Sequence, residues 1–401
     1  MARALFYFLA LVDKKTGWAI AHGWLVVLVH LEIIIDADAP STSRDLPPLK
    51  SPPIPNILVL IIASYLYVFA RRNRDAISNL GNAGALGARL FLAPPKSRLV
   101  GWMVRSGMDF PRAIEEDLLS WETTLLLCKD PEKLSTKGEL KYSDNTFGPK
   151  KFRYLTEPLK IQPMHIKDTP LMASYAFHFL VSPDDAIKQI QELLSLRRSA
   201  ALGKRPLLIW EPAPYSCHPE NLSTCLQAAE LVDVFSPNDI ELAAFFGNQQ
   251  STPLDRETVE GLAHKCIDSG IGPLGLGTVV VRAGDEGCCV HSRAQKMPTW
   301  LPAYYQSSNK MSNAAAGKVV DPTGAGNAFL GAFAIGFHET KDTILAACYG
   351  TVGASFALEQ IGMPKRQAVA GGEELWNGAD VRSRLEEYMS RLAGEGEVLP
   401  T

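Results

Sequence analysis

The chain has 401 residues, 46% of them hydrophobic, enough to bury one large core or two medium ones. A formal net charge of -3, with no basic stripe carrying interleaved aromatic residues, gives no electrostatic basis for nucleic-acid binding. The seven cysteines are scattered and include no C-x-x-C pair, which argues against a disulfide framework or a zinc site and favours a reducing, cytoplasmic setting.

Residues 1–79 differ in composition from the rest, and we expect the folded domain to cover residues 80–401. A first strand is a candidate at residues 31–36, followed by a Pro/Ser/Asp-rich linker at 37–56. The apolar run at 57–70 has 14 residues, fewer than the roughly 17–25 that span a bilayer. We interpret it as a buried or misassigned segment. A membrane anchor is the alternative, because three arginines follow within residues 71–74, and a gene-model error also stays open.

From residue 80 onward, short apolar runs alternate with helix-patterned stretches, which predicts βαβ units around a mostly parallel sheet. Strands are expected at residues 124–128, 177–181, 207–210, 232–235, 278–282 and 288–291. Helices are expected at residues 111–119, 183–196, 219–231, 239–246, 256–269, 327–337, 341–360 and 380–392. The polar, turn-rich segment 138–154 is a candidate lid or surface hairpin.

A glycine-rich turn opens the helix expected at residues 327–337. Gly324, Ala325 and Gly326 follow a β-rich run at 318–321 and lead directly into Asn327. The first N–H groups of a helix have no partner within it and lie at the positive end of its dipole, so this turn can hold an anion. Taken alone, the pattern fits a purely structural helix start equally well.

A second segment combines a buried strand with Asn238 and Glu241 at the start of a helix. The two residues are three apart and therefore share a face of the helical turn. A carboxylate there can hold Mg2+ through water molecules. On local grounds a helix cap explains the pattern better, with Glu241 completing a capping box.

The strand predicted at residues 278–282 ends in Arg282 and a Gly-x-x-Gly turn, Gly284 to Gly287. Ligands in open α/β sheets lie beyond such carboxyl ends, although a plain hairpin would also need glycines with positive φ. Glu211 ends another predicted strand and can reach phosphates or Mg2+ from there, with a solvated loop acid as the alternative. His178, like the other histidines, has no metal-ligand spacing and is interpreted as structural.

In order and spacing, these segments resemble the pfkB, or ribokinase-like, carbohydrate kinases, whose second signature reads D-T-x-G-A-G-D. The resemblance covers roughly residues 80–392 and is greatest to the fungal maintenance-of-killer group. It is carried by residues 86–91 (LGARLF), 100–102 (VGW), 152–156 (FRYLT), 209–212 (IWEP), 321–327 (DPTGAGN) and 374–378 (ELWNG). It implies a three-layer α/β fold, a mostly parallel sheet with helices on both faces and a small lid.

The resemblance also implies a transferase that moves a phosphoryl group from ATP, with Mg2+, to a sugar-like hydroxyl. It places the nucleotide between the Gly284 turn and the helix beginning at Asn327, and adds Asp321 and Thr323 to the nucleotide-binding residues. Glu241 is the implied magnesium ligand. Dimerisation through the lid is common in the superfamily.

One departure concerns the reaction itself, because the family's proton-accepting aspartate is Asn327 here, as it is in the maintenance-of-killer group. An amide accepts no proton at physiological pH, and general-base catalysis is worth roughly 10²–10⁴-fold. We therefore expect a slow or atypical kinase in which Asp321 or a water replaces the base. A nucleotide-binding pseudokinase and a protein-interaction scaffold are the alternatives.

A second departure concerns the acceptor. The family's Gly-Gly turn corresponds to Gly81-Asn82, and its sugar-binding asparagine has no clear counterpart. The sequence therefore does not identify the acceptor.

Overall fold

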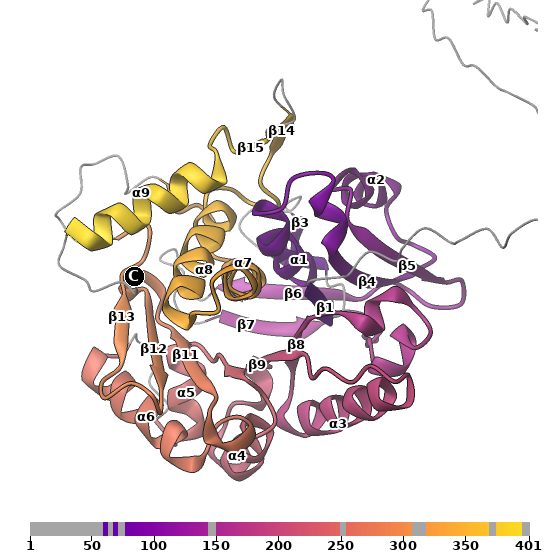
Figure 1. Ribbon diagram of the computed structural model, residues 1–401. Coiled ribbons are helices and arrows are strands. Elements are labelled where there is room, and N and C mark those ends of the chain that lie inside the picture. Colours follow the sequence, from indigo (N-terminus) through magenta and orange to yellow (C-terminus); the bar gives the residue numbers. More distant parts are fainter. Residues whose placement is uncertain are drawn as a thin grey trace, which may run out of the picture. The chain divides into compact units, whose positions relative to one another are not determined.

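The computed structural model describes residues 59–62, 67–70, 77–142, 150–248, 254–306, 318–368 and 374–394, all within one compact unit of residues 53–401. Its centre is a nine-stranded sheet (Figure 1). In spatial order the strands are β13 (Thr299–Leu301), β12 (Cys288–Ser292), β11 (Thr278–Arg282), β10 (Val234–Phe235), β9 (Leu207–Pro212), β8 (Ala176–Val181), β1 (Val59–Ile62), β4 (Val100–Gly107) and β5 (Thr124–Asp130). Neighbours are parallel from β11 to β5, whereas β12 and β13 are antiparallel additions.

Helices cover both faces of this sheet (Figure 1). One face carries α1 (Leu80–Leu90), α2 (Arg112–Ser120), α7 (Ala325–Thr340), α8 (Thr343–Leu358) and α9 (Val381–Gly394). The other carries α3 (Pro183–Ser199), α4 (Leu222–Ala229), α5 (Asp239–Phe245) and α6 (Arg256–Ser269). Side chains alternate along a strand, so Val280 of β11 enters the first core and Val279 and Val281 enter the second. The three-layer α/β fold is therefore confirmed.

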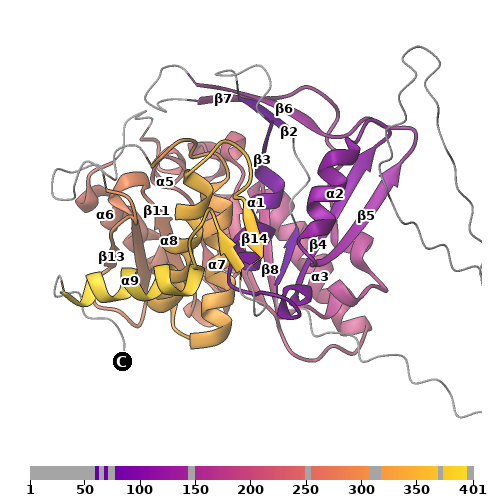
Figure 2. The ribbon, with the colours of Figure 1, turned by 90° about the horizontal axis from the view of Figure 1, so that it is seen from above.

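A smaller, four-stranded sheet has the order β3-β2-β6-β7, formed by β3 (Ile77–Asn79), β2 (Tyr67–Ala70), β6 (Lys137–Tyr142) and β7 (Lys150–Tyr154). Strands β6 and β7 are antiparallel, with Gly138 opposite Tyr154, so the hairpin predicted at residues 138–154 is confirmed. Figure 2 shows this sheet to one side of the main sheet. A separate hairpin joins β14 (Arg366–Ala368) to β15 (Glu374–Trp376).

The apolar run at 57–70 supplies β1 and β2, although residues 1–79 were predicted to lie outside the domain. β1 pairs in parallel with β4 on one side and β8 on the other, in the interior of the main sheet. Residues 59–62 and 67–70 are therefore strands of the folded unit, whereas the domain was predicted to begin at residue 80. Among the described residues, no helix has the length and apolarity to cross a membrane. The expected strand at 31–36 and linker at 37–56 fall outside the described residues.

The β-rich run at 318–321 does not form a strand. The backbone N–H groups of Val320 and Asp321 both donate to the carbonyl oxygen of Leu358 at the end of α8, at 2.7 and 3.2 Å. The extended segment is thus satisfied by a helix terminus and not by a sheet, which local β propensity does not reveal.

Helix α1 contains Gly81-Asn82, where the sequence predicted a turn, and it packs directly on α7. A Cβ atom on Gly87 would lie 2.0 Å from the carbonyl oxygen of Ala328, and one on Gly331 would lie 1.9 Å from that of Gly84. Only glycine permits helix backbones this close. Four glycine and asparagine residues lower the helix propensity of this segment, so its structure comes from this contact.

Candidate functional site

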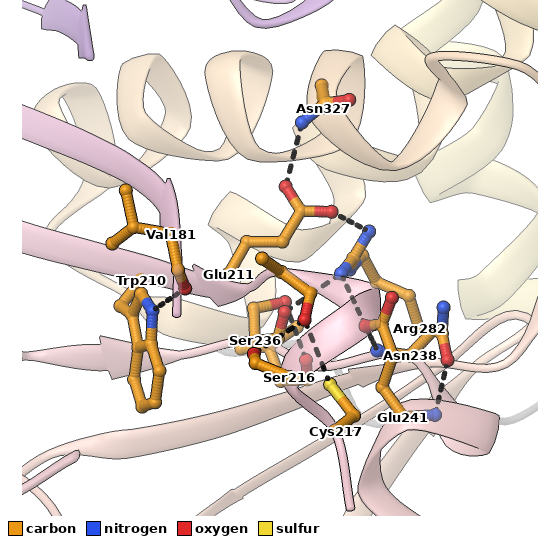
Figure 3. A network of polar contacts seen from close by, with 12 residues as sticks. Val181, Trp210, Glu211, Ser216, Cys217, Ser236, Asn238, Glu241, Arg282 and Asn327 are labelled. Carbon is orange, nitrogen blue, oxygen red and sulfur yellow. Dashed lines mark hydrogen bonds and ion pairs between the residues drawn. The ribbon is translucent and has the colours of Figure 1, made fainter. Parts of the chain in front are cut away.

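The segments singled out from the sequence meet where β9, β10 and β11 end, beside the first turn of α7 (Figure 3). Asn238 forms an isolated parallel bridge to Arg282, which aligns the start of α5 with the end of β11. Glu211 reaches across from the end of β9. In parallel sheets, this is the edge at which ligands bind.

The backbone conformation of the glycine turn is set by residues within the turn itself. Gly324 caps α7 with φ 86° and ψ -9°, a left-handed conformation that favours glycine. Asp321 is buried, and its carboxylate accepts the N–H of Thr323 at 2.9 Å. The helix begins at Ala325, two residues before the predicted start, so the N–H groups of its first turn follow the glycine cap directly.

Asn327 lies in that first turn, with 6% of its surface exposed. Its side-chain Nδ2 donates to Oε2 of Glu211 at 2.8 Å (Figure 3). The orientation of the amide follows from its partner, because an ionised carboxylate only accepts hydrogen bonds. The residue that the resemblance places at the base position therefore donates a hydrogen bond to a neighbouring carboxylate.

Glu211 is the centre of the polar network, and with 7% exposure it is no solvated loop acid. Besides Asn327, its Oε2 contacts Nε2 of His178 at 3.2 Å, and its Oε1 pairs with Nη1 of Arg282 at 2.9 Å. Burial alone would raise the pKa of Glu211, but the charge of Arg282 and the hydrogen bond to His178 outweigh it and hold the pKa below its usual value. The carboxylate is thus ionised at neutral pH.

Arg282 lies over the start of α7. A Cβ atom on Gly326 would lie 2.0 Å from Nη1 of Arg282, so the guanidinium occupies the space beside that glycine. Its Nη2 donates to the carbonyl oxygen of Ser236 at 2.9 Å and lies 3.7 Å from Oε2 of Glu241. A cation at a helix N-terminus is electrostatically unfavourable unless an anion joins it. Glu211 supplies one such charge, and phosphoryl oxygens are a second kind of partner for this geometry.

Asn238 and Glu241 form the capping box that local reasoning favoured. The N–H of Glu241 donates to Oδ1 of Asn238 at 2.7 Å, and the N–H of Asn238 donates to Oε2 of Glu241 at 2.8 Å. No group of three or more His, Cys, Asp or Glu side chains in the described part of the chain is arranged to hold a metal ion. A magnesium ion here would therefore depend on water and phosphate ligands as well.

Gly284 and Gly287 form the turn of the β11–β12 hairpin, with φ values of 57° and 95°. The N–H of Ala283 donates to the carbonyl oxygen of Gly287 at 2.8 Å, and a Cβ atom on Gly287 would lie 2.0 Å from the carbonyl oxygen of Leu301. Gly287 is therefore required by the hairpin itself. A Cβ atom on Gly284 would meet nothing within 4 Å, so this residue borders open space at the ligand edge of the sheet.

His178 is the member of the network that the sequence did not assign to the site. It is fully buried on β8, and its Nδ1 has no hydrogen-bond partner among the described residues. The sequence does contain a signal for this pairing, because His178 and Glu211 are polar residues in otherwise apolar strands, AFHFLV and LLIWEP. A buried polar side chain needs a partner, and here each supplies one for the other.

Comparison with solved structures defines the class of fold. A proposed ribokinase II of E. coli, in complex with ATP and Mg2+, superimposes with a TM-score of 0.56 at 15% sequence identity. The match covers 83% of this chain and 99% of that one. The fold is thus ribokinase-like.

Sequence relatives define the family. The family model described as pfkB family carbohydrate kinase matches residues 176–365. An uncharacterised protein of Schizosaccharomyces pombe is 33% identical over 330 residues, covering 80% of this chain and 89% of that protein. Protein MAK32 of Saccharomyces cerevisiae is 30% identical over 305 residues, covering 74% and 80%. The chain belongs to the pfkB family of carbohydrate kinases, with MAK32-like fungal relatives, as the resemblance predicted.

Proposed function

We propose that the protein is a pfkB-type carbohydrate kinase-like enzyme that transfers a phosphoryl group from ATP to a sugar-like hydroxyl, slowly or atypically. The start of α7 is the observation that carries this proposal. There the left-handed Gly324, a helix N-terminus without a side-chain cap and the guanidinium of Arg282 come together, and Asn327 replaces the expected base.

The first turn of α7 would stabilise the transferring phosphoryl group. The N–H groups of Gly324, Ala325 and Gly326 lie at the glycine cap and first turn, at the positive end of the helix. Of these, the N–H of Ala325 donates to the carbonyl oxygen of Pro322 at 3.2 Å, a bond that an anion would have to replace or share. Phosphoryl transfer depends mostly on positioning and on stabilising charge, and these do not require a carboxylate at position 327. This favours retained, slow transfer over complete loss.

The nucleotide would lie along the turn from Gly284 to Gly287, with Asp321 and Thr323 at its phosphate end. Arg282 would contact the phosphates from the end of β11. The openness beside Gly284 and the position of the guanidinium over α7 support this placement.

Magnesium fits the donor chemistry of the same cluster. Magnesium in nucleotide sites takes one or two carboxylates together with phosphate oxygens and water. Glu241 and Glu211, both buried, contact the same guanidinium, and Glu241 would hold the ion through water. The bound ion would neutralise charge on the phosphates, as expected for a family whose fold neighbour binds ATP and Mg2+.

A nucleotide-binding pseudokinase is the second candidate, favoured by one observation. Asn327 cannot accept a proton, and its amide is already bonded to Glu211. A scaffold that binds no nucleotide is the third. Dimerisation through the β3-β2-β6-β7 sheet and a cytoplasmic location belong to the main proposal.

Calorimetric titration of the full chain with ATP and Mg2+ tests the proposal. Binding at micromolar to low-millimolar affinity supports the nucleotide site and justifies a panel of sugars, polyols and nucleosides for turnover. ATP binding without turnover on any acceptor favours the pseudokinase. No binding by the folded protein favours the scaffold.

A further inference from the structure

We propose that Glu211 is the proton acceptor of this phosphoryl-transfer site. The resemblance to the pfkB kinases places the accepting carboxylate at position 327; here the accepting carboxylate would lie on β9, hydrogen-bonded to Asn327. The inference rests on the proposed kinase function and deepens it. Its basis is the 2.8 Å contact between Oε2 of Glu211 and Nδ2 of Asn327 at the first turn of α7 (Figure 3).

The carboxylate of Glu211 has capacity for one more hydrogen bond. Two carboxylate oxygens accept about four hydrogen bonds. Asn327, His178 and Arg282 account for three. An acceptor hydroxyl would supply the fourth.

The charge of Glu211 suits this role. Although burial alone would raise it, the pKa of Glu211 is held below its usual value by Arg282 and His178, so the group is ionised and ready to accept at neutral pH. A weak base suffices in a loose phosphoryl-transfer transition state, in which the protein contributes mainly position and charge.

In the proposed step, the O–H bond of the acceptor breaks and its proton moves to a carboxylate oxygen of Glu211. The acceptor oxygen uses the released electron pair to bond the γ-phosphorus of ATP. The bond between that phosphorus and the β,γ-bridging oxygen breaks, and its electron pair leaves with ADP. Glu211 later releases the proton to water.

Asn327 is then a positioning residue matched to Glu211. An aspartate at position 327 would set two carboxylates in contact, and like charges this close cannot both ionise. With an amide at 327 and an acid at 211, the site has a single ionised carboxylate at this point, held by a donated hydrogen bond.

The test compares the full-length wild type with Glu211→Gln, Asn327→Asp and the double variant. ATP binding is followed by calorimetry, and ADP release is followed with the best acceptor of the panel, or with water as acceptor. Glu220→Gln is the matched control, because Glu220 also contacts a histidine, His218 at 2.8 Å, but lies exposed outside the site.

Glu211→Gln is expected to lower turnover by about 10²–10⁴-fold, the range of general-base catalysis, and to remove the acidic limb of the pH–rate profile. Asn327→Asp is expected to give no gain, and the double variant to recover at least about tenfold over Glu211→Gln. The control is expected to match the wild type.

Turnover of Glu211→Gln within twofold of the wild type, or a gain in Asn327→Asp alone, would overturn the inference. If Glu211→Gln does not fold, the turnover of Asn327→Asp relative to the wild type decides the test alone. A wild type that binds ATP but releases no ADP overturns the inference and leaves nucleotide binding intact. A folded wild type that binds no ATP overturns the proposed function as well.

Discussion

Replacement of Asn327 by aspartate should destabilise the protein in a strongly pH-dependent way. In the wild type, Nδ2 of Asn327 lies 2.8 Å from Oε2 of Glu211, and both residues are buried. An aspartate would place an oxygen there. Two unit charges about 2.8 Å apart repel by about 6 kcal/mol at an effective dielectric constant of about 20.

Protonation of one of the two carboxyls is the less costly outcome. Each pH unit above the pKa costs about 1.4 kcal/mol, so protonating a group of ordinary pKa about 4.3 costs about 4 kcal/mol at pH 7 and about 1 kcal/mol at pH 5. These figures are upper limits, because the charge of Arg282 offsets part of the repulsion. The folded variant binds a proton that the unfolded chain has released, so its stability falls as the pH rises.

Urea-induced unfolding at pH 5 and pH 7, followed by tryptophan fluorescence, measures this difference. The loss for Asn327→Asp is expected to be several-fold larger at pH 7. The double variant with Glu211→Gln is expected to lose this pH dependence, because only one carboxyl then remains at the contact. An equal loss at both pH values, or a pH dependence that persists in the double variant, would refute the contact between the two side chains.

Three further substitutions test the guanidinium beside α7, the buried ion pair of Arg89 and the imidazole of His291. Gly326→Ala should displace the guanidinium from the start of α7 and weaken ATP binding by about tenfold, or about 1.4 kcal/mol, by calorimetry. Gly261→Ala, at an open helical position, is its control and should bind normally. Arg89→Ala breaks a buried ion pair and should lower the free energy of unfolding by about 3–5 kcal/mol, whereas Arg112→Ala, in an exposed pair, should change little. Burial and a neighbouring histidine, His264, lower the pKa of His291 in the folded protein. Below about pH 6.5 the unfolded chain therefore binds more protons than the folded protein does. The thermal midpoint should therefore drop between pH 7 and 5.5, and by less in His291→Gln; an equal drop would contradict this account.

Local sequence patterns predicted those elements whose own residues favour them. β11 matches its predicted residues, because a β-branched run between turn signals defines a buried strand. α6 also matches, with Asp255 capping its start and Gly270 ending it in the left-handed conformation. In contrast, α1 depends on its contact with α7, and β1 on pairing with two strands distant in sequence. Such elements have no local signal strong enough to reveal them.

The candidate site likewise combines segments that local sequence predicts with contacts between residues far apart in the chain. The glycine turn, the capping box and the Gly-x-x-Gly hairpin were predicted as segments, because each is specified within a few residues. The network that joins them was not, because Asn327 and Glu211 are 116 positions apart and meet only when α7 packs over β9. The place of Arg282 beside Gly326 likewise depends on two elements far apart in the chain.

Two of the stretches on which the resemblance rests contribute a structural pair. Arg89, in the stretch 86–91, is fully buried and donates two hydrogen bonds of 2.7 Å to Glu374, in the stretch 374–378. Its guanidinium also lies 5.5 Å from the ring centre of the buried Trp376. Residues 374–376 are thus packed against the rest of the domain through Glu374 and Trp376. These motifs hold the β14–β15 hairpin to α1.

The buried charges of the candidate site bear on the choice between an enzyme and a scaffold. A buried ion pair such as Arg282–Glu211 is weak evidence for stability, because apolar residues of similar volume often stabilise a fold as well or better. Here the guanidinium also stands at the positive end of a helix, which makes the arrangement costlier without an anion. Stability alone therefore explains the cluster poorly. A bound phosphoryl group would compensate both the helix end and the guanidinium, which favours a protein that binds nucleotide.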